Sequence, residues 1–208
     1  MHRRHFIAGL SLAGMLAACG RKPKLAAIPA GQTVLAFGDS VTFGTGAGPG
    51  EDWPTLLGQQ TGWRMVNAGI PGDTAAAGKE RLQALLDEHR PALVIVELGG
   101  NDFLRRRPHQ AVKEDLRQIV QRAKASGAQV VLVAVPELSL LGVLAGKPTD
   151  AELYRELADE EKVALVGEVF SGILARPELC ADKIHPNAEG YRQVAAGIYA
   201  ALQQLGLR

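Results

Sequence analysis

The chain alternates short, uninterrupted apolar runs with longer segments whose apolar residues recur at helical spacing. Uninterrupted runs are typical of strands buried on both faces, and recurrence every three to four residues is typical of the helices that cover them. Strands are predicted at 33–37, 64–67, 93–96, 130–135 and 163–166. Helices are predicted at 51–61, 74–89, 108–126, from 150 onward, and from 188 to about 205.

This alternation predicts a parallel sheet with helices on both faces, which is a three-layer α/β domain. Segments 41–50 and 136–148 fall between predicted elements and are expected to be loops. The first is rich in glycine, and the second is apolar and is interpreted as packing over the core. Because the carboxyl ends of parallel strands meet at one edge, candidate chemistry is expected where the strands finish.

The first residues are predicted to be an export signal, separate from the fold. Arg3 and Arg4 give a positive start, and an apolar run of small residues without acids follows to residue 18. This run is too short for an ordinary membrane-spanning helix. The small residues before Cys19 resemble a bacterial lipobox, which implies that Cys19 becomes a lipidated first residue. The expected organisation is a signal at 1–18, a lipidated cysteine and flexible tether at 19–31, and a domain at 32–208.

The residue after the cysteine bears on location. Cys19 is followed by Gly20 and not by aspartate, which by the bacterial sorting pattern implies the outer membrane. The expected location is therefore the cell envelope, with the membrane as a partner through the lipid anchor. A plain signal peptide with an incidental cysteine stays an alternative, and the paired arginines leave a twin-arginine export route open.

The charge balance argues against a nucleic-acid partner. The 208 residues carry a net charge of +1, and removal of 1–18 takes away Arg3 and Arg4 and no acid, which leaves −1. Domains that bind nucleic acid show a marked basic excess instead. Two cysteines in an exported chain would suggest a disulfide, but lipidation of Cys19 leaves Cys180 as a free thiol.

A serine, a histidine and an aspartate form the first candidate for chemistry. Ser40 follows Gly38 and Asp39 at the end of the first predicted strand, where a tight turn would present its hydroxyl. A nucleophilic serine needs a base, usually histidine, and a group that orients the base. His185 lies in a loop before the last helix, and Asp182, three residues earlier, can reach its Nδ1.

The other two histidines of the mature chain are interpreted as structural. His89 lies at the end of an amphipathic helix, where a cation suits the helix dipole, and His109 follows a basic, solvated segment. Acyl transfer also needs donors for a tetrahedral oxyanion. Gly72, at a helix start, and Asn101, at the tip of the third strand, are candidates for that role.

Five stretches together resemble the SGNH (GDSL-type) hydrolase family, and within it the bacterial thioesterase, lysophospholipase and arylesterase branch. They occur in the family order and cover nearly the whole predicted domain: 37–40 (FGDS), 53–57 (WPTLL), 66–74 (VNAGIPGDT), 96–102 (VELGGND) and 182–187 (DKIHPN).

The resemblance implies a flavodoxin-like sheet of about five parallel strands and a serine esterase that uses no metal or cofactor. Ser40 would be the nucleophile, His185 the general base and Asp182 the residue that orients it. Ser40, Gly72 and Asn101 would form the oxyanion hole. The expected partner is a small or lipid-like ester, hydrolysed by a monomer. An alternative within the same class is an acetyl esterase that acts on envelope polysaccharide or peptidoglycan.

The same residues allow other interpretations. Cys180 with His185 could form a nucleophile pair, but no oxyanion donors accompany it. A metal site at Asp182 and His185 lacks a clustered third ligand. The basic run 105–107 could meet a phosphate or an anionic lipid, although such runs are usually solvated faces. A non-catalytic, ligand-binding surface lipoprotein would have no need of the whole set of five site residues.

Overall fold

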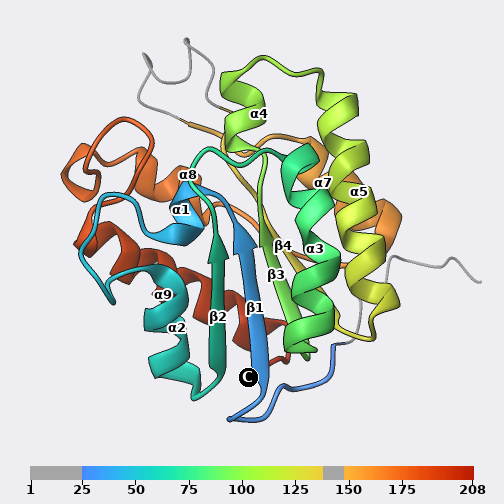
Figure 1. Cartoon of the computed structure of the whole chain (residues 1–208). Helices are drawn as coiled ribbons and strands as arrows, with labels where there is room; N and C mark the ends of the chain where they lie inside the picture. Colours follow the sequence, from blue (N-terminus) through green and yellow to red (C-terminus); the bar gives the residue numbers. More distant parts are fainter. Residues whose placement is uncertain (1–24, 138–147) are drawn as a thin grey trace, which may run out of the picture.

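The computed structural model describes residues 25–137 and 148–208, and its centre is a five-stranded parallel sheet (Figure 1). Along the sheet the strands follow the order β2-β1-β3-β4-β5. Their bounds are β1 Thr33–Gly38, β2 Arg64–Gly69, β3 Leu93–Glu97, β4 Gln129–Val133 and β5 Ala164–Val166. The predicted parallel α/β fold is therefore confirmed.

The strand register brings the carboxyl ends of three neighbouring strands to one level. Gly38, the last residue of β1, pairs with Gly69 of β2 and with Glu97 of β3. Each strand then continues into a loop or helix at the same edge of the sheet. Segments far apart in the sequence are thus placed side by side, as the topology of open α/β sheets requires.

Helices cover both faces of the sheet (Figure 1). Leu35 and Phe37 of β1 belong to one core cluster, whereas Val34 and Ala36 belong to the other. Alternate side chains of the strand therefore enter different cores, as the two-residue period requires. The first core is closed by α3 (Ala75–His89), α5 (His109–Ala125) and α7 (Leu153–Glu161), and the second by α2 (Trp53–Thr61), α8 (Val169–Leu174) and α9 (Ala188–Gln204).

Short helices appear where only loops were predicted. These are α1 (Ser40–Phe43), α4 (Gly100–Leu104) and α8, together with the 3-10 turn at Pro177–Leu179. A helix of one or two turns has too few apolar positions to show a periodic pattern, so the sequence analysis missed all of them. The loop prediction for 41–50 is wrong at its start, and that for 136–148 lies mostly outside the described residues.

Two element boundaries also differ from the prediction, for a local reason. β4 ends at Val133, although Ala134 and Val135 remain buried and bond to neighbouring backbone. The following helix, α7, begins at Leu153 and not at Asp150. The Asp150 carboxylate accepts the backbone N–H of Glu168 instead of capping a helix, which ties the β4–α7 connection to the end of β5.

The domain also begins earlier than predicted. Ile28 is buried, its N–H donates to the carbonyl of Leu207, and its own carbonyl accepts the indole N–H of Trp63. Gly31 donates to Gly62. Residues 28–31, assigned to the tether from sequence, are therefore part of the packed domain. The export signal and Cys19 lie outside the described residues. No helix within the described ranges is both long and apolar enough to cross a membrane.

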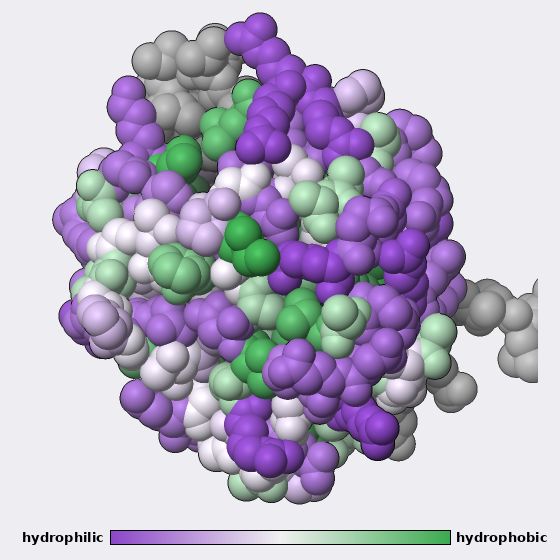
Figure 2. All heavy atoms as spheres, in the orientation of Figure 1, coloured by the Kyte–Doolittle hydropathy of each residue, from purple (hydrophilic) through white to green (hydrophobic). Residues whose placement is uncertain are grey.

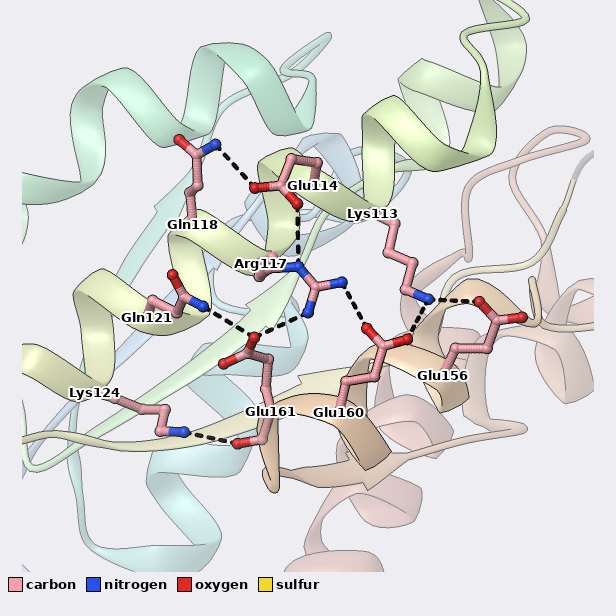
Figure 3. A network of polar contacts seen from close by, with 9 residues as sticks. All are labelled: Lys113, Glu114, Arg117, Gln118, Gln121, Lys124, Glu156, Glu160 and Glu161. Carbon is pink, nitrogen blue, oxygen red and sulfur yellow. Dashed lines mark hydrogen bonds and ion pairs between the residues drawn. The ribbon is translucent and has the colours of Figure 1, made fainter.

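A network of charged side chains joins α5 to α7 across the surface (Figure 3). Lys113 Nζ lies 2.7 Å from Glu156 and 2.8 Å from Glu160. Arg117 contacts Glu160 at 2.6 Å and Glu161 at 3.0 Å, so Glu160 is shared by both cations. Isolated surface pairs contribute little, but sharing one carboxylate between two cations orders several side chains together. The network fixes α7 against α5.

Glycines in the last helices give a direct test of packing. In α9 a Cβ at Gly190 would lie 2.2 Å from the carbonyl oxygen of Leu179, whereas in α8 a Cβ at Gly172 would meet no atom within 4 Å. Gly190→Ala is expected to lower the free energy of unfolding by about 1–3 kcal/mol, because backbone must move. Gly172→Ala is the matched control and should leave Tm unchanged or raise it. Equal Tm values for the two variants would contradict this packing.

Candidate active site

The turn after β1 places Ser40 at the start of a one-turn helix. The Asp39 carboxylate accepts the N–H of Val41 at 3.0 Å and caps α1, and Gly44, in the left-handed region, ends it. Only glycine fits before this turn, because a Cβ at Gly38 would lie 2.6 Å from the carbonyl oxygen of Glu97. The close approach of β1, β3 and α1 therefore determines where the Ser40 side chain emerges.

Ser40, His185 and Asp182 lie in one hydrogen-bonded line. The Nε2 of His185 is 2.9 Å from the hydroxyl oxygen of Ser40, and its Nδ1 is 2.8 Å from Oδ2 of Asp182. The other Asp182 oxygen accepts the N–H groups of Ile184 and His185, each at 2.8 Å. The structure thus brings together three side chains that the sequence analysis selected separately. An aspartate on Nδ1 leaves Nε2 as the proton acceptor toward serine.

The electrostatics of Asp182 favour its charged form. Burial by itself would raise the pKa of this carboxyl group, but the hydrogen bond with the His185 ring and those from the backbone N–H groups of Ile184 and His185 outweigh it. The net result is a pKa below the ordinary aspartate value. Asp182 is therefore a carboxylate at neutral pH and can stabilise a positive charge on the imidazole.

The loop that carries His185 is fastened at both ends. The N–H of Ala181 donates to the His185 carbonyl at 2.9 Å, which closes a tight turn around the ring. Asn187 then caps α9, since its side chain accepts the N–H of Gly190, while its own N–H donates to Leu179. The ring is thereby positioned by the start of a long, buried helix.

Asn101 and Gly72, the two other candidate oxyanion donors, both lie at the carboxyl edge of the sheet but make different contacts. The Asn101 amide nitrogen donates to Oδ2 of Asp39 at 3.1 Å and to the carbonyl of Asp73 at 3.0 Å, and Asn101 shares a cavity with Ser40 and His185. Gly72 lies in the exposed β2–α3 loop with φ +82°, and its carbonyl accepts from Arg105. The Asn101 amide, the expected oxyanion donor, is therefore engaged by two acceptors in this structure.

Two buried acids lie beneath the serine, and the sequence analysis gave Glu97 no role. Asp39 is 2% exposed and Glu97 is 1% exposed. Burial raises the pKa of Asp39 to about 6, although the hydrogen bonds from the Val41 N–H and the Asn101 amide act to lower it. Burial, and then the neighbouring Asp39, raise the pKa of Glu97 well above the usual range, although the Thr42 hydroxyl donates to it at 2.7 Å. The sequence did hold a signal for this buried acid, because Glu97 directly follows the apolar residues of a predicted strand.

The cavity beside Ser40 is small. Its volume is about 40 Å³. Its apolar wall is formed by Val41, Leu104, Val135, Pro136, Phe170, Leu174 and Ile184. A cavity of this size favours a small acyl group over a long one.

The other candidates from the sequence do not join this hydrogen-bonded line. Cys180 directs its thiol at the carbonyls of Ile173 and Arg176, and burial, followed by nearby acids, raises its pKa, which disfavours a nucleophilic thiolate. The His109 ring packs on Phe103, and His89 lies 3.7 Å from Glu88. Among residues 25–137 and 148–208, no three His, Cys, Asp or Glu side chains gather as metal ligands.

Comparison with known proteins places the chain in a family. The model of the GDSL-like Lipase/Acylhydrolase family matches residues 36–193, so the chain belongs to that family. It is 35% identical over 186 residues to Esterase TesA of Pseudomonas aeruginosa, covering 85% of this chain and 90% of that protein. It is 36% identical over 179 residues to Thioesterase 1/protease 1/lysophospholipase L1 of Escherichia coli K12, covering 85% and 86%. A crystal structure of TesA superimposes with a TM-score of 0.74 at 34% identity, covering 84% and 99%.

The raised pKa of Asp39 predicts a pH-dependent stability. The native state holds this proton up to about pH 6, whereas the unfolded state releases it near pH 4, so the contribution is full below pH 4 and is lost as pH rises through 6. The difference in unfolding free energy between wild type and Asp39→Asn should therefore fall by roughly 2–3 kcal/mol from pH 4 to pH 7. Urea titrations measure it, with the exposed Asp159→Asn as control. A constant difference would refute the assignment.

Proposed function

We propose that this protein is a serine esterase that hydrolyses acyl esters and thioesters through an acyl-enzyme. The observation that carries the proposal is the line from Ser40 through His185 to Asp182, with heavy-atom separations of 2.9 and 2.8 Å across 145 residues of sequence. It is supported by membership of the acylhydrolase family and by relatives named esterase, thioesterase and arylesterase.

In the proposed reaction His185 transfers one proton in each of the two half-reactions. As Ser40 Oγ attacks the ester carbonyl carbon, Nε2 accepts the hydroxyl proton, and Asp182 stabilises the imidazolium. The tetrahedral intermediate collapses, the C–O or C–S bond breaks, and Nε2 returns the proton to the leaving alcohol or thiol. A water molecule then attacks the acyl-Ser40 ester with the same base, which releases the acid and restores the serine. No metal or cofactor takes part, and one chain supplies every group.

The oxyanion of each tetrahedral intermediate needs donors in place before the reaction. We assign this role to the N–H groups of Ser40 and Gly72 and to the side-chain amide of Asn101. Ser40 begins α1, so its N–H is not used within that helix. Asn101 would share a hydrogen with the oxyanion at the expense of Asp39 or Asp73, its acceptors in the free protein.

A second candidate substrate follows from the size of the cavity. A cavity of about 40 Å³ favours a short acyl group such as acetyl over a long one. Acetylated polysaccharide or peptidoglycan of the envelope is therefore the alternative substrate, with the same nucleophile, base and donors. Longer acyl chains require the cavity to open or the chain to extend over the rim.

Labelling with a fluorophosphonate tests the nucleophile. The wild-type protein should form one covalent adduct, because the probe phosphonylates a serine activated by a histidine. Ser40→Ala should abolish labelling and ester hydrolysis, whereas Cys180→Ala, which removes the competing nucleophile, should label as wild type does. In-gel fluorescence and intact-protein mass measure both. Equal labelling of Ser40→Ala and wild type would refute the assignment.

We further propose that residues 1–18 are a lipoprotein signal and that Cys19 anchors the domain in the cell envelope, at the outer membrane. The support is the positive start, the apolar run of small residues and the cysteine that follows it, with glycine next. Since Leu25 already packs against the core and the Ala26 backbone exchanges two hydrogen bonds with the Gln129 side chain, the tether between the lipid and the domain is short.

The anchor is tested in cells that process lipoproteins. Radiolabelled palmitate should be incorporated into the wild-type chain and not into Cys19→Ala, and the variant should leave the membrane fraction. Cys180→Ala serves as the matched control and should stay labelled and membrane-bound. Palmitate incorporation by Cys19→Ala would contradict the proposal.

A further inference from the structure

Large exposed apolar side chains gather around the catalytic edge. Within the described residues, those that are exposed are Phe43 at 56%, Leu104 at 47% and Ile70 at 46%. Phe43 follows β1, Ile70 follows β2 and Leu104 lies in α4 after β3, and these three strands are neighbours in the sheet. All three side chains therefore lie at the carboxyl edge, around Ser40.

Contacts between these loops make a continuous rim. Phe43 packs its backbone against Gly69, since a Cβ there would lie 2.2 Å from the Phe43 nitrogen, and Ile70 is the next residue. Leu104 lines the cavity beside Ser40, and its neighbour Arg105 bonds to the β2–α3 loop. In Figure 2 green side chains reach the surface in the upper half, beside strongly purple ones, where β1, β2 and β3 end in Figure 1.

Uncompensated positive charge accompanies this rim. Arg105 and Arg106 are exposed and follow Leu104 directly. Within the described part of the chain, ion pairs engage Arg107, through Asp102 and Asp115, and none engages Arg105 or Arg106. This local excess stands out because residues 25–208 carry 18 basic and 22 acidic side chains, so the domain as a whole is negative.

We propose that this rim, Phe43, Ile70 and Leu104 with Arg105 and Arg106, docks the catalytic edge on an anionic phospholipid surface. Apolar side chains at a rim insert into the boundary between headgroups and acyl chains, and adjacent cations pair with anionic headgroups. A partner protein would fit the apolar residues equally well, but the two unpaired arginines favour a surface of phosphate groups. Docking presents an ester at the lipid surface directly to Ser40.

Vesicle co-sedimentation tests the rim without relying on catalysis. Residues 25–208 are used, since both core clusters lie within 28–207 and the apolar leader would bind lipid by itself. The domain should bind phosphatidylglycerol–phosphatidylcholine vesicles and not pure phosphatidylcholine. The double variant Arg105→Gln/Arg106→Gln should bind about 30-fold more weakly, because each cation near an anionic surface contributes roughly a factor of five.

Two further double variants distinguish the contribution of the rim to vesicle binding from that of surface charge in general. Phe43→Ser/Ile70→Ser should also lose binding, whereas Arg155→Gln/Arg192→Gln, which removes two exposed arginines elsewhere, should bind as wild type does. Thermal melts establish that each variant is folded. Absence of wild-type binding, or equal loss from both arginine pairs, overturns the proposal. Neither result bears on fluorophosphonate labelling of Ser40, so the esterase assignment is tested separately.

Discussion

The hydrogen bond between the His185 ring and the Ser40 hydroxyl joins segments 145 residues apart, and much of the fold acts to hold its two ends. One end is held by the register of β1, β2 and β3, which allows only glycine at position 38 beneath the turn. The other end is held by α9, whose capped start fixes the loop that carries the ring. Parallel pairing therefore determines the position of Ser40, and the capped start of α9 determines that of His185.

The polar groups under Ser40 show the cost of this arrangement. Asp39 caps α1 and bonds to Asn101, while Glu97 accepts the hydroxyl of Thr42, and both carboxyl groups are almost fully buried. Burying acids this close together is unfavourable unless protons or hydrogen bonds compensate, and their raised pKa values reflect that. The surface above is different in kind: Phe43, Ile70 and Leu104 are exposed at the carboxyl edge, and within the described residues Arg105 and Arg106 take part in no ion pair.

Much of this could be predicted from the sequence, for identifiable reasons. Buried strands and long amphipathic helices leave periodic patterns, so the sheet and its main helices were located, and Ser40, Asp182 and His185 were chosen by the chemistry they require. One-turn helices such as α1 leave no periodic pattern. The partners of Asn101 and the burial of Glu97 depend on contacts between distant segments. The contact between Ile28 and Leu207, near the C-terminus, also joins distant segments. For this reason the sequence assigned too many residues to the tether.

A crystal structure of the enzyme with a covalently bound phosphonate ester would test the central claim most directly, because the phosphonyl group stands in for the tetrahedral intermediate. The account predicts a bond from phosphorus to Ser40 Oγ. It also predicts a phosphonyl oxygen within hydrogen-bonding distance of the N–H groups of Ser40 and Gly72 and of the Asn101 amide, with His185 still bonded to Asp182. An adduct on another residue, or a phosphonyl oxygen directed away from all three donors, would contradict it.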